Sequence, residues 1–352
     1  MTHVYLFSMR VLWITPGFAA DERDFNCIPP MQLLAQVLTR QGVDLQIVTL
    51  EYPFRDEPYD WHGATIWPCN GQNRRWLKIR TLWRARQFCQ KILEEKTTAA
   101  VHSFWLGWAS ALGERLSRRY DIPHVTTLMG QDVLPQNWKF LRGLSLERAA
   151  QLVAVSDFQN DVFEKHTGLR AAKVIPWGVV EAEISAIFPS ERPLDVLGAG
   201  SLVPVKNWEK WLHVIALVVK TVPDLNAEIV GGGVEYIKLE RLSRQLNLEK
   251  NVRFTGELSR PEVLEKMRTA KVLLHTAHYE SFGYVLAEAA MNGCRVLGTP
   301  VGATMQFGET AENEGDLAAL LQKILAQNAR QEPFVIFTMQ ETMAAYLKMY
   351  QK

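Results

Sequence analysis

Short apolar runs with strand character alternate with amphipathic helical segments along almost the whole chain. In the first half, Gly42 and Pro123 each separate a helical segment from the strand that follows it. The expected strands are residues 11–15, 44–50, 64–68, 99–103, 124–129, 152–156 and 173–175, and the expected helices are residues 30–41, 75–95, 107–120 and 157–166. Such alternation favours parallel strands joined by right-handed helical crossovers.

The alternation pauses over residues 176–193, a stretch rich in proline that predicts a loop, and then restarts. Further strands are expected at residues 194–197, 227–230, 252–255, 272–275 and 295–297, and further helices at 207–220, 234–246, 260–268, 283–291 and 316–327. The length of 352 residues agrees with about two domains. The sequence therefore predicts two doubly wound, Rossmann-like α/β domains facing across a cleft, where a ligand would bind at the carboxyl ends of the strands.

Composition excludes several classes of protein. Apolar residues make up 47% of the chain and charged residues 22%, as in soluble globular proteins, which excludes a disordered, collagen-like or coiled-coil architecture. The 39 basic and 38 acidic residues nearly cancel, so we expect no nucleic-acid partner.

The four cysteines, Cys27, Cys69, Cys89 and Cys294, are too scattered for a disulfide framework and lack metal-ligand spacing. A cytoplasmic location is expected, since no uncharged run reaches the roughly 20 residues of a membrane span and the amino-terminal segment lacks the features of a signal peptide. Residues 1–8 are either an upstream extension or a short ordered lead-in.

Residues 278–293 form the segment that indicates chemistry most clearly. They follow an expected buried strand and run through a turn into a helix, with Ser281 as the expected N-cap and Gly293 as the helix stop. Gly283 lets backbone approach a ligand, and the amide groups of a helix N-terminus bind anions. Together with the carboxylates of Glu280 and Glu288, such an anion site suits a phosphorylated sugar. The alternative is an ordinary capped helix with a solvated Glu288.

Two glycine-bearing loops follow other expected strands. Residues 198–207 contain Lys206 next to their last residue; Lys206 could neutralise a diphosphate, although a lysine after a strand usually faces solvent. Their glycine spacing fits neither a Walker A loop nor a dinucleotide fingerprint. Residues 231–233 are three glycines that keep side chains away from a cleft, or simply form a flexible turn.

Four motifs in order make the chain resemble the retaining family-4 glycosyltransferases of GT-B fold. The motifs are Gly-x-Leu-x-Pro-x-Lys at 200–206, Ile-Val-Gly-x-Gly at 229–233, Val-x-Phe-x-Gly at 252–256 and Glu-x-Phe-Gly-x-x-x-x-Glu at 280–288. The resemblance is strong over about residues 195–302. It is weaker over residues 10–180, where Val-Ala-Val-Ser at 153–156 and Ile-Pro-Trp-Gly-Val at 175–179 are similar to landmarks of the family.

The resemblance implies a role for each matching residue. Glu280 would contact hydroxyl groups of the donor sugar, the amides near Gly283 and Lys206 would hold the diphosphate, and Glu288 would bind the ribose. Residues 254–258 would border the nucleobase. The donor site is thus expected to contain Glu288, Phe282, Gly283, Tyr284, Gly200, Gly232 and Phe254, with Glu280, Lys206 and Asp132 as catalytic candidates.

Three departures from the family pattern matter. Ser201 stands where relatives often carry a diphosphate-binding arginine, so the positive charge depends more on Lys206. Met129 stands where many relatives carry a histidine beside the sugar, and methionine cannot transfer a proton. Asp132 is a neighbouring candidate for that role, or a turn aspartate. The segment after Gly302 lacks the usual landmarks of the family's last donor-domain loop.

A retaining transfer in this family is thought to need no covalent protein nucleophile, because the departing phosphate can take the acceptor proton. Positioning and charge stabilisation are then the protein's task. With Lys206 and helix-end amides available and no Asp-x-Asp cluster in the chain, we expect no metal and no cofactor, only a UDP- or GDP-linked sugar as donor. A glycan or lipid-linked acceptor in cell-surface polysaccharide synthesis is the expected partner.

Other classes stay open. Met129 and Ser201 favour a non-catalytic protein that binds nucleotide sugars, and a sugar-nucleotide epimerase or glycan phosphorylase could share the fold. A dinucleotide-dependent oxidoreductase is disfavoured. Residues 15–18, at the end of the first expected strand, read Thr-Pro-Gly-Phe and do not begin a Gly-x-Gly-x-x-Gly motif.

Residues 74–91 are basic and contain no acidic residue. On a helix, Trp76, Ile79 and Trp83 share one face, which suits peripheral contact with the inner face of a membrane or with an anionic glycan. We favour the alternative that these three side chains pack on the sheet, because a helix between two strands must bury one face.

The chain ends in a further helix. Residues 339–350 carry apolar side chains at helical spacing, and the strand–helix alternation is complete before residue 330. In the architecture that this chain resembles, the last helix crosses back to the first domain. We therefore expect domains over 1–180 and 181–330, and a crossing helical segment over 331–352.

Overall fold

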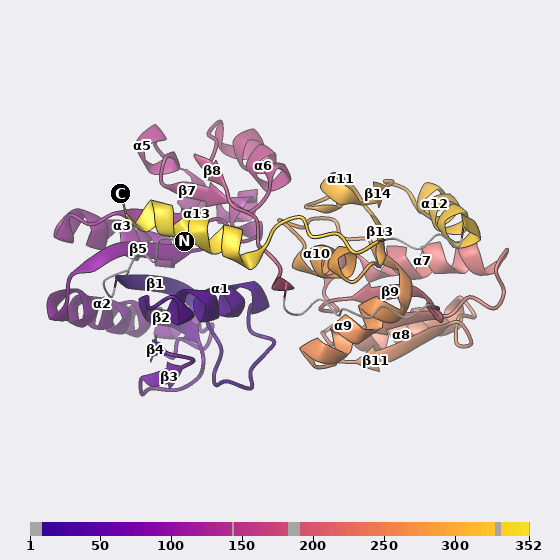
Figure 1. The fold of residues 1–352 in the computed structure, drawn as a ribbon, viewed down its shortest axis with the longest axis horizontal. Helices are drawn as coiled ribbons and strands as arrows, with labels where there is room; N and C mark the ends of the chain where they lie inside the picture. The colour runs from indigo at the N-terminus through magenta and orange to yellow at the C-terminus, as the bar shows by residue number, and fades with distance from the viewer. Residues whose placement is uncertain (1–8, 143, 182–190, 328–331, 352) are drawn as a thin grey trace, which may run out of the picture. The chain divides into compact units, whose positions relative to one another are not determined.

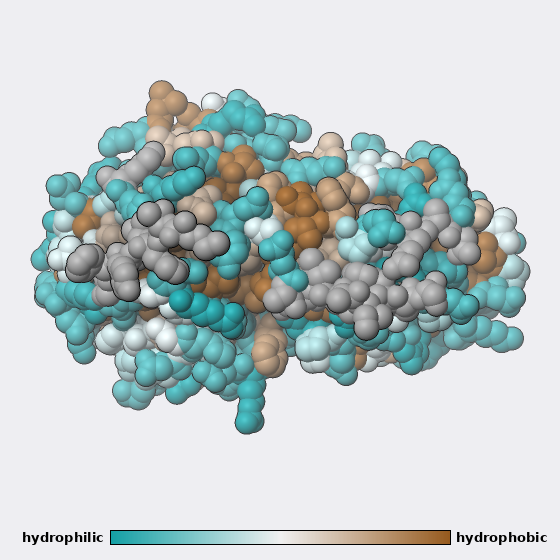
Figure 2. Space-filling view, viewed as in Figure 1, coloured by the Kyte–Doolittle hydropathy of each residue, from teal (hydrophilic) through white to brown (hydrophobic). Residues whose placement is uncertain are grey.

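The computed structural model describes residues 9–142, 144–181, 191–327 and 332–351 (Figure 1). The chain divides into two compact units, one made of residues 1–178 and 337–352, the other of residues 179–336. The prediction for residues 1–8 lies outside the described residues. Hydrophilic residues cover most of the visible face of each unit (Figure 2).

The first unit is built on a sheet of eight strands in the order β3-β4-β2-β1-β5-β6-β7-β8. The strands are β1 (Arg10–Gly17), β2 (Asp44–Tyr52), β3 (Tyr59–Trp61), β4 (Ala64–Pro68), β5 (Thr98–Phe104), β6 (His124–Thr127), β7 (Leu152–Ala154) and β8 (Lys173–Val174). The sheet is parallel except for β3, an antiparallel edge strand that the sequence did not predict. Parallel strands are covered by helices on both faces, which is why β1 reads as a continuous apolar run.

Helices α1 (Pro29–Arg40), α2 (Lys78–Glu95), α3 (Trp108–Tyr120) and α6 (Asp157–Thr167) connect these strands, with the short α4 (Trp138–Leu141) and α5 (Leu146–Ala149) between β6 and β7. The prediction that Trp76, Ile79 and Trp83 pack on the sheet is wrong. Its buried side chains are Thr81, Ala85, Cys89 and Ile92, whereas Trp76, Ile79 and Trp83 are 72%, 85% and 60% exposed. Small residues bring this helix close to the sheet, and the three large apolar side chains point away from it.

The last helix, α13 (Met339–Tyr350, yellow in Figure 1), packs beside α1 in the first unit. Its bounds are those expected from the sequence. Two buried tyrosines attach it to the sheet: Tyr346 Oη lies 2.9 Å from Thr127 Oγ1, and Tyr350 Oη lies 2.6 Å from His102 Nδ1. Trp13 Nε1 also donates to Tyr350 Oη, at 3.3 Å.

The second unit is built on a parallel sheet with the order β11-β10-β9-β12-β13-β14. Its strands are β9 (Leu194–Ala199), β10 (Ala227–Val230), β11 (Val252–Gly256), β12 (Ala270–His275), β13 (Arg295–Gly298) and β14 (Glu309–Thr310). Its helices are α7 (Trp208–Val219), α8 (Tyr236–Gln245), α9 (Arg260–Thr269), α10 (Tyr284–Met291), α11 (Thr304–Phe307) and α12 (Glu314–Gln327). The strand order reverses between β9 and β12, and the carboxyl ends beside such a reversal are where open α/β sheets bind ligands.

The core of the second unit lies between its sheet and the helices α7 and α12. Trp211, Leu212 and Ile215 of α7 pack on Val196 and Leu274 of the central strands. The parallel pairing of β9 with β12 places the first residues of the loops after them beside each other, and these two loops carry the main predicted site residues. The short β14 at the edge was not predicted.

Candidate active site

The loops after β9 and β12 meet through an ion pair. Lys206 Nζ, at the end of a short 3-10 turn (Pro204–Lys206), contacts Glu280 Oε2. Backbone bonds hold the two loops together, since the His278 N–H donates to the Val205 carbonyl at 2.9 Å. Thr276 Oγ1 also donates to the carbonyl of Asn207 at 3.0 Å. The structure thus brings together two predicted catalytic residues at the point where the strand order reverses.

Glu280 is held in its charged form. Burial alone would raise the pKa of its carboxyl group, but the charge of Lys206 and the neighbouring His275 outweigh burial and lower the pKa to about 2. His275 Nε2 lies 3.5 Å from Glu280 Oε2. Burial lowers the pKa of His275 itself, so its imidazole is neutral near pH 7. A permanently ionised carboxylate is a hydrogen-bond acceptor for hydroxyl groups and cannot act as a proton donor at neutral pH.

The turn into α10 is built around a left-handed glycine. Gly283 has φ 82° and is the N-cap of α10, so the prediction that Ser281 caps the helix is wrong. A Cβ at position 283 would lie 2.6 Å from Leu286 Cδ1. The neighbouring Phe282 is buried, and its carbonyl accepts the Ala303 N–H at 2.7 Å. These contacts fix the position of the N-terminus of α10, whose positive end attracts anions.

Glu288 lies inside α10 and is buried rather than solvated. Its Oε1 forms an ion pair with Arg260 Nη1, from the first residue of α9. The Arg260 guanidinium carbon also lies 5.6 Å from the centre of the Tyr284 ring. Arg260 and His275 are the members of this cluster that the sequence analysis missed. Arg260 follows the end of β11 by four residues, so a search of every strand end on this sheet would have found it.

The predicted glycines bring two loops together. A Cβ at Gly231 would lie 2.0 Å from the Gly200 carbonyl oxygen, and a Cβ at Gly233 would lie 2.4 Å from the Leu202 carbonyl oxygen. Beside Gly232, the space is taken by Glu257, whose Oε1 would lie 2.6 Å from an added Cβ. The glycines therefore have a packing role that is visible without a ligand, and a role of Gly200 and Gly232 in nucleotide binding stays a prediction.

Phe254 is half-buried on β11 and packs edge-to-face on Tyr236, with ring centres 5.7 Å apart. Its place beside a nucleobase stays a prediction. Ser201, which stands where relatives often carry an arginine, is exposed. Its backbone carbonyl accepts a hydrogen bond from Trp208 Nε1 at 3.0 Å.

Asp132 belongs to the first unit, where its carboxylate accepts hydrogen bonds from backbone N–H groups. Its Oδ2 accepts the Leu106 N–H at 2.8 Å and the Met129 N–H at 3.3 Å, and its Oδ1 accepts the Gly130 N–H at 2.7 Å. Burial raises the pKa of Asp132 to about 6, against the opposing effect of these bonds. The side chain has a clear structural role, and its catalytic role stays a prediction.

Within the described ranges, no group of three or more His, Cys, Asp or Glu side chains is arranged to hold a metal ion. None of the helices in these ranges combines the length and apolar character that a bilayer crossing needs.

Comparison with known proteins places this architecture in a family. The family described as glycosyl transferases group 1 matches residues 180–335, and glycosyltransferase family 4 matches residues 31–183. The 2-deoxystreptamine N-acetyl-D-glucosaminyltransferase of Niallia circulans is 27% identical over 160 residues, which are 43% of this chain and 41% of that protein. The poly(glycerol-phosphate) alpha-glucosyltransferase of Bacillus subtilis is 30% identical over 109 residues, 31% of this chain and 16% of that protein.

Both matches span less than half of these relatives. Solved structures match over a longer range. Alr3699/HepE of Anabaena, in complex with UDP and glucose, superposes with a TM-score of 0.69 at 18% identity, covering 97% of this chain and 95% of that one. Sucrose-phosphate synthase from Thermosynechococcus elongatus gives a TM-score of 0.70 at 14% identity, with 97% and 95% covered. The two family matches overlap at residues 180–183 and together span residues 31–335, and the fold agrees over 97% of the chain. The chain therefore belongs to the GT-B glycosyltransferases of the group 1 and family 4 type.

Proposed function

We propose that this protein is a retaining glycosyltransferase that moves a hexose-type sugar from a UDP- or GDP-linked donor to a glycan or lipid-linked acceptor, in the synthesis of a cell-surface polysaccharide. The observation that carries the proposal is the Lys206–Glu280 pair at the strand-order reversal of the second unit, which joins the loop after β9 to the loop that leads into α10. The solved relative Alr3699/HepE, in complex with UDP-glucose in one structure, supports the class of donor.

Different residues bind different parts of the donor. The ammonium group of Lys206 and the N-terminus of α10 stabilise negative charge on the diphosphate. Glu280 accepts hydrogen bonds from sugar hydroxyls, and Glu288 accepts them from the ribose while Arg260 keeps its carboxylate oriented. On donor binding, Lys206 shares its donor groups between Glu280 and the diphosphate.

The reaction breaks the bond between the sugar C1 and the diphosphate oxygen and forms a bond from the acceptor oxygen to C1 on the same face. The acceptor proton passes to the departing phosphate oxygen, so no side chain has to form a covalent intermediate. The protein orients the reactants and stabilises the leaving group, and no metal ion is part of the proposal.

A thermal-shift screen against UDP-, GDP- and ADP-sugars tests donor binding, since a ligand at 100 times its Kd stabilises the protein by about 2.7 kcal/mol. The anomeric configuration of the product, read by NMR, tests retention. Inversion would contradict the mechanism. Donor binding without turnover would favour the second candidate, a non-catalytic nucleotide-sugar binder, for which Met129 and Ser201 are the supporting observations.

A further inference from the structure

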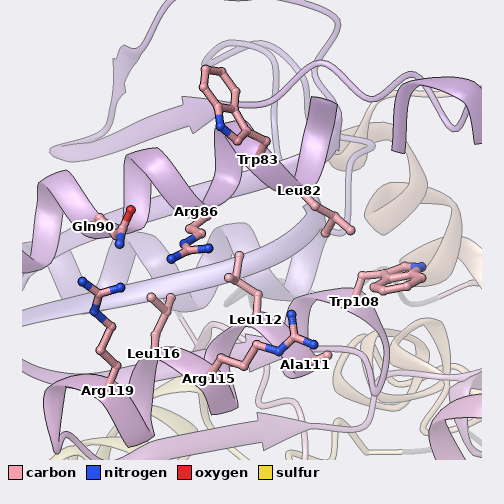
Figure 3. A pocket seen from close by; sticks show the side chains of 10 residues that line it. All are labelled: Leu82, Trp83, Arg86, Gln90, Trp108, Ala111, Leu112, Arg115, Leu116 and Arg119. Atoms are coloured by element: carbon pink, nitrogen blue, oxygen red, sulfur yellow. The ribbon is translucent and has the colours of Figure 1, made fainter. Parts of the chain in front are cut away.

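Helices α2 and α3 of the first unit lie side by side and leave a groove of about 390 Å³ between them (Figure 3). The lining side chains of α3 recur at helical spacing, from Trp108 through Leu112 and Leu116 to Arg119, so one face of that helix is turned to the groove. The mechanism proposed above uses none of these residues.

The floor of the groove is apolar and its walls are cationic. Leu82, Leu112 and Leu116 line the floor, and the guanidinium groups of Arg86, Arg115 and Arg119 surround it. No acidic side chain is among the described residues that line it, and no hydrogen bond or ion pair of these three arginines to another described side chain is found. Positive charge is therefore concentrated over a hydrophobic surface.

This arrangement selects the chemistry of a ligand. Arginine and tryptophan side chains only donate hydrogen bonds, and Gln90 is the one described lining side chain that can accept one. Sugar hydroxyls need acceptors as well as donors, so an uncharged glycan is a poor match. A phosphate diester has acceptor oxygens and no donor, and guanidinium groups bind phosphate in a bidentate way.

The outer face of α2 continues this surface. Ile79, 85% exposed, lies one turn before Trp83, which lines the groove, and Trp76, 72% exposed, lies in the 3-10 turn Arg75–Leu77 that leads into α2. Exposed tryptophan and isoleucine beside basic residues are typical of helices that lie at a bilayer surface. Other basic residues of α2 are engaged elsewhere: Lys78 pairs with Glu51, and Arg80 and Arg84 pair with Asp56.

We propose that the α2–α3 groove binds the phosphate head group of an anionic phospholipid, with the first methylene groups of the lipid on the leucine floor, and thereby docks the first unit on an anionic bilayer. Trp76, Ile79 and Trp83 enter the interfacial layer of the membrane. The proposal does not depend on the glycosyl transfer proposed above, because its residues lie outside the donor site.

Flotation of the full-length protein with phospholipid vesicles tests the proposal. Binding is expected to vesicles of phosphatidylcholine that contain about one third phosphatidylglycerol, and not to phosphatidylcholine alone. The triple variant Arg86→Gln/Arg115→Gln/Arg119→Gln should bind the anionic vesicles about 100-fold more weakly, on the scale expected for three basic residues at an anionic surface. Ile79→Ser, which changes no charge, should weaken binding about tenfold.

A matched control removes the same charge elsewhere on the first unit. Arg40, Lys165 and Lys173 are exposed and lie outside the groove, so the variant Arg40→Gln/Lys165→Gln/Lys173→Gln should bind vesicles within about threefold of the unchanged protein. Circular dichroism melting establishes that all variants are folded. Equal losses in the two triple variants, or tighter binding to a soluble sulfated oligosaccharide than to the vesicles, would overturn the proposal.

Discussion

Lys206 and Glu280, 74 residues apart in the chain, form an ion pair across the two loops at the strand-order reversal of the second unit. The two side chains have different expected partners in a bound donor. Lys206→Ala should weaken UDP or GDP binding about 10- to 100-fold, the range of a charge-assisted hydrogen bond. Glu280→Gln should lower glycosyl transfer far more than it lowers nucleotide affinity, because its expected partner is the sugar.

Isothermal titration with UDP and GDP, alongside initial rates, separates the two effects. Lys220→Ala, an exposed lysine at the end of α7, is the control for loss of one positive charge. Equal losses of transfer and nucleotide affinity in Glu280→Gln would contradict the assignment of Glu280 to the sugar.

The Arg260–Glu288 pair predicts an asymmetry in stability. Removing one member of a buried ion pair takes away the opposite charge that compensates the other, so Arg260→Ala or Glu288→Ala should each lower the free energy of unfolding by about 3 kcal/mol or more. The double variant Arg260→Ala/Glu288→Ala should regain part of that loss, since both charges of the pair are removed. Urea unfolding measures the three values. Strict additivity would show that the two side chains do not interact.

Nucleotide binding should not recover in the double variant, because the acceptor for the ribose hydroxyls is absent from it. Affinity for UDP or GDP close to that of the unchanged protein in Glu288→Ala would rule out the ribose role.

Gly283→Ala should destabilise the second unit and weaken donor binding together. The left-handed φ of 82° and the contact with Leu286 make a Cβ unfavourable, at a cost of about 1–3 kcal/mol. Gly315→Ala is the matched control, since Gly315 is exposed within α12 and has only Asn313 Oδ1 nearby, at 3.4 Å. That substitution should raise the melting temperature, because alanine favours a helix by about 0.5–1 kcal/mol over glycine. A rise in both variants would argue against the strained turn.

Tyr350→Phe should destabilise the first unit by about 1–3 kcal/mol, because it leaves His102 Nδ1 buried without its hydroxyl partner. Tyr346→Phe should destabilise the first unit by a similar amount, because Thr127 loses its hydroxyl partner.

Deletion of residues 335–352 should destabilise the first unit far more and enlarge the radius of gyration measured by solution scattering. An unchanged melting temperature and radius after the deletion would show that α13 does not stabilise the first unit.

Two buried histidines predict that the first unit loses stability in acid. Burial lowers the pKa of His124 to about 3 and that of His102 well below its usual 6.5. The unfolded chain then binds more protons than the folded one, so each histidine removes about 1.4 kcal/mol of stability per pH unit below 6.5. Asp132 acts in the opposite direction between pH 6 and 3.8, since its folded pKa is raised to about 6.

Melting temperatures at pH 7.5 and 5.0 measure the net effect, and His124→Asn should make the pH dependence shallower. A wild-type protein that is equally stable at both pH values would contradict this account.

Hydrophobic periodicity predicts most of the fold because every long element buries a continuous face. β10, β4 and α13 have the bounds expected from the sequence, whereas the short edge strands β3 and β14 were missed. The buried face of α2 was predicted wrongly. Apolar spacing shows that side chains share a face of a helix, but it does not show whether the sheet or solvent lies against that face. Here Ala85 and Cys89 lie against the sheet, and Trp76 and Trp83 do not.

At the site, the motifs around Lys206 and Glu280 predict that their two loops lie together, and in the structure the two side chains form an ion pair. Arg260 was not predicted, because its importance depends on a partner in another helix, and its place four residues after β11 is the one local signal of its role. Ser281 looked like an N-cap by residue type, but the turn needs a positive φ, which favours Gly283.

The attachment of α13 gives the polypeptide an order of assembly during its synthesis. The second unit is one continuous stretch of chain and can fold as soon as that stretch has left the ribosome. The first unit is interrupted, and Trp13, His102 and Thr127 gain their tyrosine hydroxyl partners only when Tyr346 and Tyr350 have emerged. Until then, these three side chains lack the tyrosine contacts that join them to α13, so the unit translated first is the one completed last.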